Sequence, residues 1–159
     1  MMEIIAIPRQ RKPVLIGRNG SVKERIEKET KTKIRISEDV KIEGEALSVL
    51  KAKDIVRAIA RGFSPEKAFM LLDEDCQLDI ITLVNENENT RERLFARVIG
   101  RKGKTRNIIE QKTGAFLSVY GKTVAIIGRH DQLSRARLAV EHLLEGRTHK
   151  SVYAMLCKK

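Results

Sequence analysis

The chain contains one sequence pattern twice, and this repeat limits how it can fold. A shift of 83 residues superimposes 16–20 on 99–103, and both copies read Ile-Gly-Arg-x-Gly. One inserted residue then changes the offset to 84, which pairs 40–44 with 124–128. A match of this length with a single one-residue gap indicates a duplication. The 159 residues are therefore predicted to form two small domains rather than one.

Each copy predicts the element order β-α-α-β-β-α. An apolar run opens the copy, a short helix ends at the Ile-Gly step, and an amphipathic helix follows at about 20–30 and 103–113. Two strands with a tight link come next, and a long helix closes the copy. The predicted strands lie at 3–7, 33–37, 40–44, 78–84, 115–120 and 123–128. The fold class is therefore α+β, with two three-stranded antiparallel sheets that each carry three helices on one face.

The two long closing helices are each predicted to bury one apolar stripe. The expected inner-face residues are Leu47, Leu50, Ile55 and Ile59 in the first helix, and Leu133, Ala136, Val140, Leu143 and Leu144 in the second. Gly62 and Gly146 are placed to end these helices, because glycine readily adopts the left-handed conformation of a helix C-terminus.

The predicted boundaries are 1–62 for the first domain, 63–76 for a linker with a short helix, 77–146 for the second domain and 147–159 for a helical tail. Ser64 is expected to be the N-cap of the linker helix. Four apolar linker residues are expected to dock the two domains together: Ala68, Phe69, Leu71 and Leu72. Three tail residues at helical spacing are expected to pack on the second domain: Val152, Tyr153 and Leu156.

The net charge narrows the choice of partner. The 32 Lys and Arg residues against 21 Asp and Glu residues give +11, which favours an anionic partner such as nucleic acid. No run of 18 apolar residues is present, and the N-terminus lacks a basic region before an apolar stretch. A cytoplasmic protein with no membrane partner is expected. Cys76 and Cys157 are expected to be reduced thiols, and no metal site is expected, because zinc needs more ligands at closer spacing.

The residues give no support to catalysis. His130, His142 and His149 do not have the spacing of metal ligands, and no carboxylate pair lies beside a candidate nucleophile. The Gly-x-x-Gly turns lack the Lys-Ser/Thr ending of a P-loop. The chain is therefore expected to be a binding protein with no cofactor and no enzymatic activity.

The repeated Gly-x-x-Gly turn suits the backbone of a single-stranded nucleic acid. The glycines at Gly17, Gly20, Gly100 and Gly103 carry no Cβ atom that would hold a sugar-phosphate chain away. The helix after each turn directs backbone N–H groups and its positive end toward a phosphate. The alternative is that the first glycine of each turn only caps the preceding helix. The duplicated tetrad in this setting favours binding.

The helix, the Ile-Gly-x-x-Gly turn, the second helix and the strand pair together resemble the KH domain in its type I order. In that family the turn holds about four single-stranded nucleotides. Their bases are expected to lie in an apolar groove between the paired helices and the middle strand. The resemblance implies that Ile16, Val22, Ile34 and Ile36 line the first groove, and that Ile99, Thr105, Leu117 and Val119 line the second. Arg35 is a candidate for reading base edges.

The second copy is the more basic at its turn. Its stretch "GRKGKTR" (100–106) follows Arg97 and contains Arg101, Lys102, Lys104 and Arg106. The stretch "GRNGSVK" (17–23) has only Arg18 and Lys23, and its Asn19 can only form hydrogen bonds. The second domain is therefore expected to contribute more phosphate affinity. The first is expected to bind RNA weakly or to offer part of its surface to a protein.

Three longer stretches resemble the partner-of-Nob family of small-subunit ribosome-assembly factors. They are "GFSPEKAFMLLDEDCQLDIITL" (62–83), "RVIGRKGKTRNIIEQKTGAFLSVYGKTVAIIG" (97–128) and "HKSVYAML" (149–156). The resemblance spans the whole chain. The intact first turn and the absence of an N-terminal extension resemble archaeal members of that family.

This resemblance implies that the protein binds single-stranded RNA at the 3′ end of small-subunit (16S) pre-rRNA and supports maturation of that end by a Nob-type endonuclease. It implies two further partners, the rRNA adenine dimethyltransferase and the alpha subunit of translation initiation factor two. Two alternatives stay open. One is a general tandem-KH regulator of mRNA, and the other is a protein-docking scaffold whose basic charge is incidental.

Overall fold

The structure is a computed structural model that describes residues 1–83 and 85–158. The chain divides after Glu74 into two compact units, called here the first unit and the second unit. Most of the expected linker, residues 63–74, belongs to the first unit, and the expected tail belongs to the second. The last residue of the strand predicted at 78–84 lies outside the described residues.

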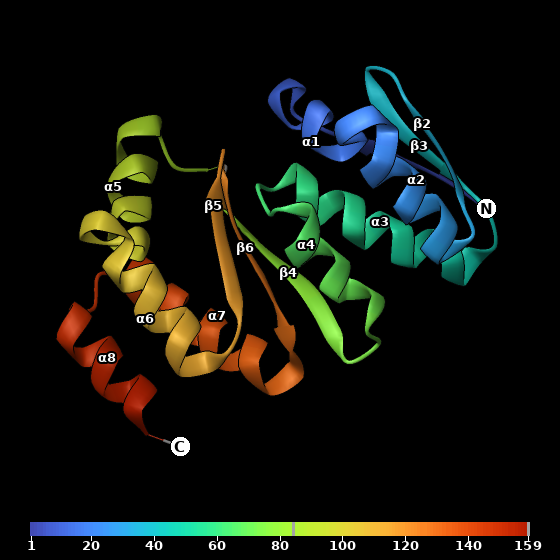
Figure 1. The fold of residues 1–159 in the computed structure, drawn as a ribbon. Coiled ribbons are helices and arrows are strands. Elements are labelled where there is room, and N and C mark those ends of the chain that lie inside the picture. The colour runs from blue at the N-terminus through green and yellow to red at the C-terminus, as the bar shows by residue number, and fades with distance from the viewer. Residues whose placement is uncertain (84, 159) are drawn as a thin grey trace. The chain divides into compact units, whose positions relative to one another are not determined.

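The first unit follows the predicted element order (Figure 1). Its strands are β1 (Met2–Ala6), β2 (Lys33–Ile36) and β3 (Asp39–Glu43), and its helices are α1 (Lys12–Ile16), α2 (Ser21–Thr30), α3 (Ala46–Ala60) and α4 (Pro65–Ala68). The sheet is antiparallel with the order β1-β3-β2. The register places Ile34 opposite Ile42 and Ile4 opposite Lys41. Helix α2 ends at Lys31, which adopts a left-handed conformation.

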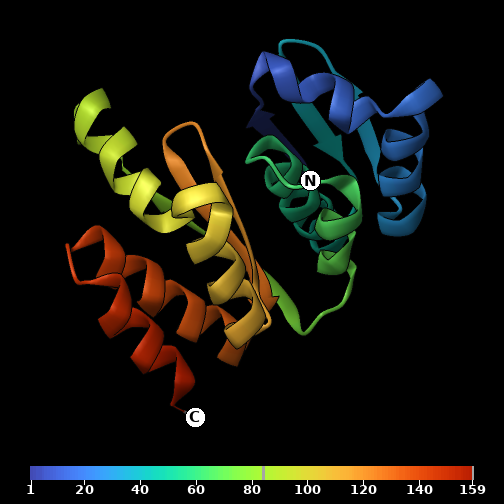
Figure 2. The same ribbon diagram turned by 60° about the vertical axis from the view of Figure 1, so that its left-hand side comes forward.

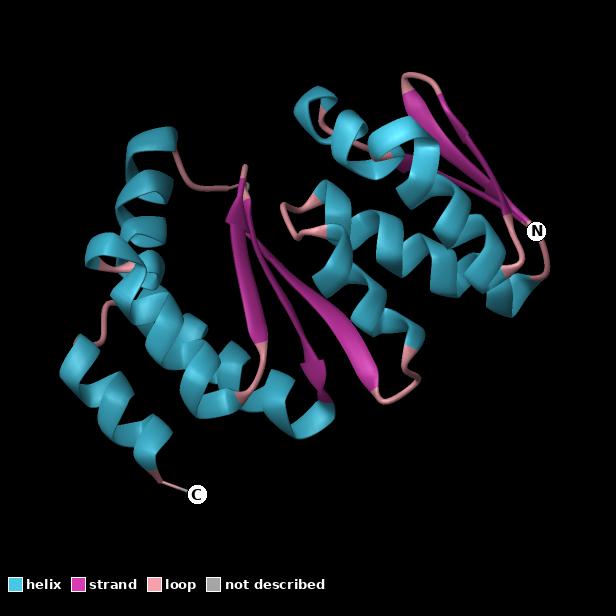
Figure 3. Cartoon of the chain, viewed as in Figure 1, coloured by secondary structure: helices cyan, strands magenta, loops and turns pink. Residues whose placement is uncertain are grey.

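The second unit repeats this arrangement. Its strands are β4 (Cys76–Thr82), β5 (Phe116–Tyr120) and β6 (Thr123–Arg129), and its helices are α5 (Glu88–Ile99), α6 (Lys104–Thr113), α7 (His130–Leu144) and α8 (His149–Cys157). The sheet is again antiparallel, with the order β4-β6-β5. The strands and the helices of each unit can be followed in Figure 3. The predicted α+β class with two three-stranded sheets is confirmed.

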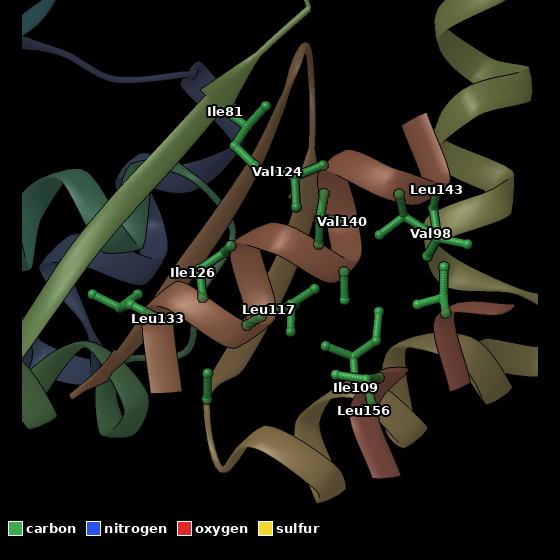
Figure 4. Close-up of a cluster of buried hydrophobic side chains, with 14 of the residues drawn as sticks. Ile81, Val98, Ile109, Leu117, Val124, Ile126, Leu133, Val140, Leu143 and Leu156 are labelled. Atoms are coloured by element: carbon green, nitrogen blue, oxygen red, sulfur yellow. The ribbon is translucent and has the colours of Figure 1, made fainter. Parts of the chain in front are cut away.

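The core of the second unit lies between its sheet and its helices (Figure 4). The sheet contributes Ile81, Leu117, Val124 and Ile126, and the helices contribute Val98, Ile109, Leu133, Val140, Leu143 and Leu156. Burying one such aliphatic side chain contributes about 1.5–3 kcal/mol. This core holds α6 against β5, and the two elements thereby border the predicted groove.

The predicted inner face of α3 is wrong at Leu47 and Leu50 and right at Ile55 and Ile59. Leu47 and Leu50 of α3 are 83% and 44% exposed, and the buried stripe starts instead at Val49 and continues through Ala52, Ile55, Val56 and Ile59. Residues two apart differ by about 200° around a helix, so a stripe that starts at Val49 turns Leu47 toward solvent. In α7, Leu133, Ala136, Val140 and Leu143 are buried as predicted, and Leu144 is partly buried.

Each unit carries a fourth helix, so the duplication extends beyond the predicted domains. At an offset of 84, Ser64 and Thr148 are both N-caps, and their side chains accept hydrogen bonds from the backbone N–H of Lys67 and Ser151. Helix α8 packs on α6 and α7, as Figure 2 shows, through the buried Val152 and Leu156. The expected packing of the tail is confirmed.

The short helix α4 and the 3-10 turn after it (Phe69–Leu72) contact α3 of the first unit. Ala68, Phe69 and Leu71 are buried, and the guanidinium of Arg25 on α2 lies 3.9 Å from the centre of the Phe69 ring. These apolar residues therefore pack within the first unit. That they also dock the two domains stays a prediction.

Candidate nucleic-acid interface

The two Gly-x-x-Gly turns have the same backbone geometry. The first glycines, Gly17 and Gly100, have φ of 75° and 76°, and the second glycines, Gly20 and Gly103, have φ of 77° and 78°. The third position is left-handed as well, with φ of 56° at both Asn19 and Lys102. Because the φ angles match at all three positions, the two turns are built alike. Positive φ angles favour glycine and are also tolerated by asparagine.

The first glycine of each turn is required by a close approach to the next helix. A Cβ atom on Gly100 would lie 2.7 Å from the Cβ and the backbone nitrogen of Thr105, and one on Gly17 would lie 2.8 Å from the same atoms of Val22. These glycines also end the preceding helices α1 and α5, as the capping interpretation holds. The turn therefore needs glycine for its shape, whatever it binds.

The second glycine of each turn opens the end of a helix. Gly20 and Gly103 are the N-caps of α2 and α6, and within residues 1–83 and 85–158 neither helix has a side-chain hydrogen bond at this cap. The first N–H groups of a helix have no partner inside it, and the helix dipole is positive there. An RNA phosphate can accept from these groups.

The predicted groove linings separate into exposed and buried residues. Ile16 is 39% exposed, and Val22, Ile36, Ile99 and Val119 are partly exposed, so these five side chains can contact a ligand. The remaining lining residues are Ile34, Leu117 and Thr105, whose side chains are buried. Their predicted role as lining side chains needs correction, because these three side chains are packed in the core and leave almost no surface for a ligand.

Thr105 has a supporting position. Its hydroxyl oxygen lies 2.9 Å from the Tyr153 hydroxyl oxygen of α8, at hydrogen-bonding distance. Thr105 also lies beneath Gly100, so the tail helix is tied to the floor of the turn. At the matching places in the first unit, Val22 and Phe69 are both apolar. The two turns therefore rest on different supports.

The open edges of β2 and β5 border the two grooves. Glu27 of α2 accepts a hydrogen bond from the Ile34 N–H, and Glu110 of α6 accepts one from the Leu117 N–H, both at 2.9 Å. Backbone groups point to the same edge at every second residue. The N–H and C=O groups of Ile36 and Val119 therefore face the same edges and can bond to a base.

The basic residues around the turns also separate into two groups. Arg18, Arg35, Arg101, Lys102 and Lys104 are exposed, whereas Lys23 forms an ion pair with Glu27 at 3.3 Å and Arg106 is partly buried. A phosphate can therefore reach the side chains at the tip of either turn. The second unit presents three exposed cations there, while the first presents one beside Asn19.

The predicted phosphate role of Arg97 needs correction. Its guanidinium donates hydrogen bonds to the backbone oxygens of Leu143, at 3.0 Å, and of Arg147. Arg11 makes the matching bonds in the first unit, to Ile59 at 2.8 Å and to Phe63 at 2.7 Å. Both arginines satisfy carbonyl groups at the C-terminal end of the long closing helix. The Arg97 guanidinium therefore stabilises the fold by binding these carbonyl groups.

A shallow cavity of about 500 Å³ adjoins the second turn. Arg101, Lys102 and Lys104 line it together with Asn107, Ile108 and Gln111 of α6. These last three residues were not predicted. Their spacing from Lys104 is that of one helix face, so the sequence pattern could have indicated them.

Two antiparallel β1-β3-β2-type sheets with Gly-x-x-Gly turns between paired helices define a tandem type I KH protein, which is a class of RNA-binding protein. The model of the second KH domain of PNO1 proteins, described as a eukaryotic-type (type I) KH domain, matches residues 75–159. A general KH-domain model matches residues 2–58. Both units are thus recognised independently.

Several relatives match nearly the whole chain. KH domain-containing protein MJ0443 of Methanocaldococcus jannaschii is 46% identical over 164 residues, which cover 98% of this chain and 72% of that protein. The crystal structure of Dim2p from Pyrococcus horikoshii OT3 has a TM-score of 0.93 and 48% identity, covering 100% of this chain and 99% of that one. A protein from Aeropyrum pernix has a TM-score of 0.91 and 34% identity, covering 98% and 88%.

A further similar structure contains RNA and a protein partner. It is an a/eIF2alpha-aDim2p-rRNA complex from Pyrococcus horikoshii OT3, with a TM-score of 0.90 and 49% identity, covering 98% of this chain and 92% of the matched chain. The chain therefore belongs to the PNO1/Dim2p family of KH-domain ribosome-assembly factors, here called partner of Nob, and resembles its archaeal members. The predicted family is confirmed.

Proposed function

We propose that this protein binds single-stranded RNA at the 3′ end of small-subunit (16S) pre-rRNA and supports maturation of that end by a Nob-type endonuclease. The observation that carries the proposal is the second turn. Two of its exposed cations, Arg101 and Lys102, lie at the N-terminal end of α6, which has no side-chain cap among the described residues. Exposed cations beside an uncapped helix N-terminus suit the phosphate backbone of a nucleic acid. The family membership supports rRNA as that nucleic acid.

The second unit contributes most of the RNA affinity in this proposal. Its turn has more exposed cations than the first, and a shallow cavity continues from the turn along α6. The first unit adds a weaker RNA contact or a protein contact. Its exposed Leu47 and Leu50 on α3 support the protein contact, because clustered exposed leucines favour association.

The proposed protein partners are the Nob-type endonuclease, the rRNA adenine dimethyltransferase and the alpha subunit of translation initiation factor two. The complex of the Pyrococcus horikoshii relative, which contains a/eIF2alpha and rRNA, supports the last of these. The protein itself acts by binding and not by catalysis. No described group of three or more His, Cys, Asp or Glu residues is arranged to hold a metal ion. Among the helices of residues 1–83 and 85–158, none combines the length and the apolar composition that a membrane span requires.

Crosslinking followed by sequencing of the RNA bound in cells tests this function. We expect reads to be enriched at the 3′ end of small-subunit rRNA, relative to a sample from cells that carry an untagged protein. Peaks dispersed over mRNAs would favour the mRNA regulator instead. Absence of any enriched RNA would favour the protein-docking scaffold.

A further inference from the structure

Arg106 has an unpaired donor in a buried place. Its Nε is buried and has no hydrogen-bond partner, and it is the one side-chain nitrogen or oxygen of this kind within residues 1–83 and 85–158. Leaving a buried donor without an acceptor costs about 1–3 kcal/mol, and the cost is greater for a charged group. A ligand that supplies an acceptor would recover this free energy.

Arg106 lies on the face of α6 that borders the groove. Residues four apart share a helix face, so Arg106 lies one turn before Glu110, whose carboxylate binds the open edge of β5 at the Leu117 N–H. The guanidinium also covers the second glycine of the turn, because a Cβ atom on Gly103 would lie 3.4 Å from Arg106 Nη2. Arg106 thus lies beside the turn, on the helix face that also carries Glu110.

The first unit lacks this arrangement. At the offset of 83, Lys23 takes the place of Arg106, and its ammonium pairs with Glu27 at 3.3 Å. Glu27 matches Glu110, but no ion pair joins Arg106 to Glu110 in the described part of the chain. The second unit therefore keeps a cation with unused donors at a place where the first unit has paired its own.

We propose that Arg106 reads a base edge in the second groove, and that it selects a base with two adjacent acceptors, guanine or cytosine. This inference rests on the proposed RNA-binding function. The guanidinium offers Nε–H and Nη–H as a planar pair of donors, which matches the O6 and N7 of guanine. The Watson–Crick edge of cytosine also presents two adjacent acceptors, whereas adenine and uracil alternate donors with acceptors.

A base edge explains the buried Nε better than a phosphate does. Phosphates are highly hydrated and have exposed partners nearby in Arg101, Lys102 and Lys104. A base that enters the groove is stripped of water, so a site built to bond it discriminates strongly against a base that leaves the donors unpaired. The wrong base is rejected because the buried Nε–H again lacks an acceptor.

Binding of four eight-nucleotide RNAs to the full chain tests the proposal. One RNA is all uridine, and the others carry a single central G, C or A. By fluorescence anisotropy, the unaltered protein is expected to bind the G or the C oligonucleotide about 10-fold more tightly than the A or the all-uridine one. Arg106→Met, of similar length, should reduce this preference to within about twofold. Arg106→Lys keeps the charge but not the fork, and should lose the preference too.

The other outcomes overturn the proposal. A phosphate role predicts that Arg106→Met weakens all four RNAs equally and that Arg106→Lys retains binding. A purely structural role predicts a lowered melting temperature and an unchanged preference. Lys112→Met, which removes an exposed charge from the same helix, should leave the preference intact. If the unaltered protein binds all four RNAs equally, only this inference fails. If it binds none, the proposed function fails.

Discussion

Replacing Arg101 and Lys102 by Asp is expected to weaken single-stranded RNA binding by about 10-fold or more. Both side chains are exposed at the tip of the second turn, so the change removes two attractive charges and adds two repulsive ones. The glycines and the core of the unit are untouched. Asp is also compatible with the left-handed backbone of Lys102, whose φ is 56°. Fluorescence anisotropy with an eight-nucleotide RNA measures the change.

The first unit offers a matched control for this variant. Arg18→Asp with Asn19→Asp alters the same two positions of a turn with the same geometry, and Asn19 also has φ of 56°. It removes one cation instead of two, so its loss of affinity should be smaller. Circular dichroism must show that both variants are folded. If the first-unit variant loses more affinity, the second unit does not hold the stronger site.

Salt is expected to weaken RNA binding steeply. If one groove engages about four phosphates, the logarithm of the binding constant should fall against the logarithm of the salt concentration with a slope near −3, since each contact to a single strand contributes about −0.7. Binding measured from 50 to 200 mM salt would then fall by roughly 60-fold.

The variants extend this test to particular side chains. Removal of one phosphate contact lowers the steepness of the slope by about 0.7, so Arg101→Ala with Lys102→Ala should bind RNA with a clearly flatter salt dependence. A slope near zero for the unaltered protein would show that ion release does not drive binding. The electrostatic part of the account would then fail.

The fold could be predicted from the sequence because the duplication repeats the patterns of the turn, the helices and the strands in both halves of the chain. The Gly-x-x-Gly turns mark the ends of paired helices in both copies, and the φ angles of Gly17 and Gly100 agree within about one degree. The extra helix of each unit was harder to recognise as part of the repeat. Only the N-caps, Ser64 and Thr148, and the buried apolar residues that follow reveal the correspondence.

Two predictions were wrong, the inner face of α3 at its N-terminal end and the phosphate role of Arg97. Leu47 and Leu50 are apolar, but a shift of two residues in the buried stripe leaves them exposed. Arg97 carries the charge of a phosphate ligand, but its guanidinium binds backbone carbonyl groups that only the folded chain brings near it. Such long-range pairings leave no local mark in a sequence.

The groove was only partly predictable for the same reason. Ile36 and Val119 are partly exposed where the account needs them, while Ile34 and Leu117, two residues earlier on the same strands, are buried. Residues two apart on a strand point to the same face, so the exposed fraction of each side chain depends on the cover that other elements give it. The approach of Arg106 to Gly103 is set by the shape of the turn, which no periodic pattern records.

Chemical-shift mapping shows which surface of the chain binds the RNA. The isotope-labelled full chain would be titrated with an eight-nucleotide RNA that copies the 3′ end of small-subunit rRNA, and the backbone amide signals would be followed by NMR. The account predicts that the largest changes occur at Gly100–Gly103, in the first turn of α6 and at Val119. Changes confined to the first-unit turn, or centred on β4 and the outer face of α7, would contradict it.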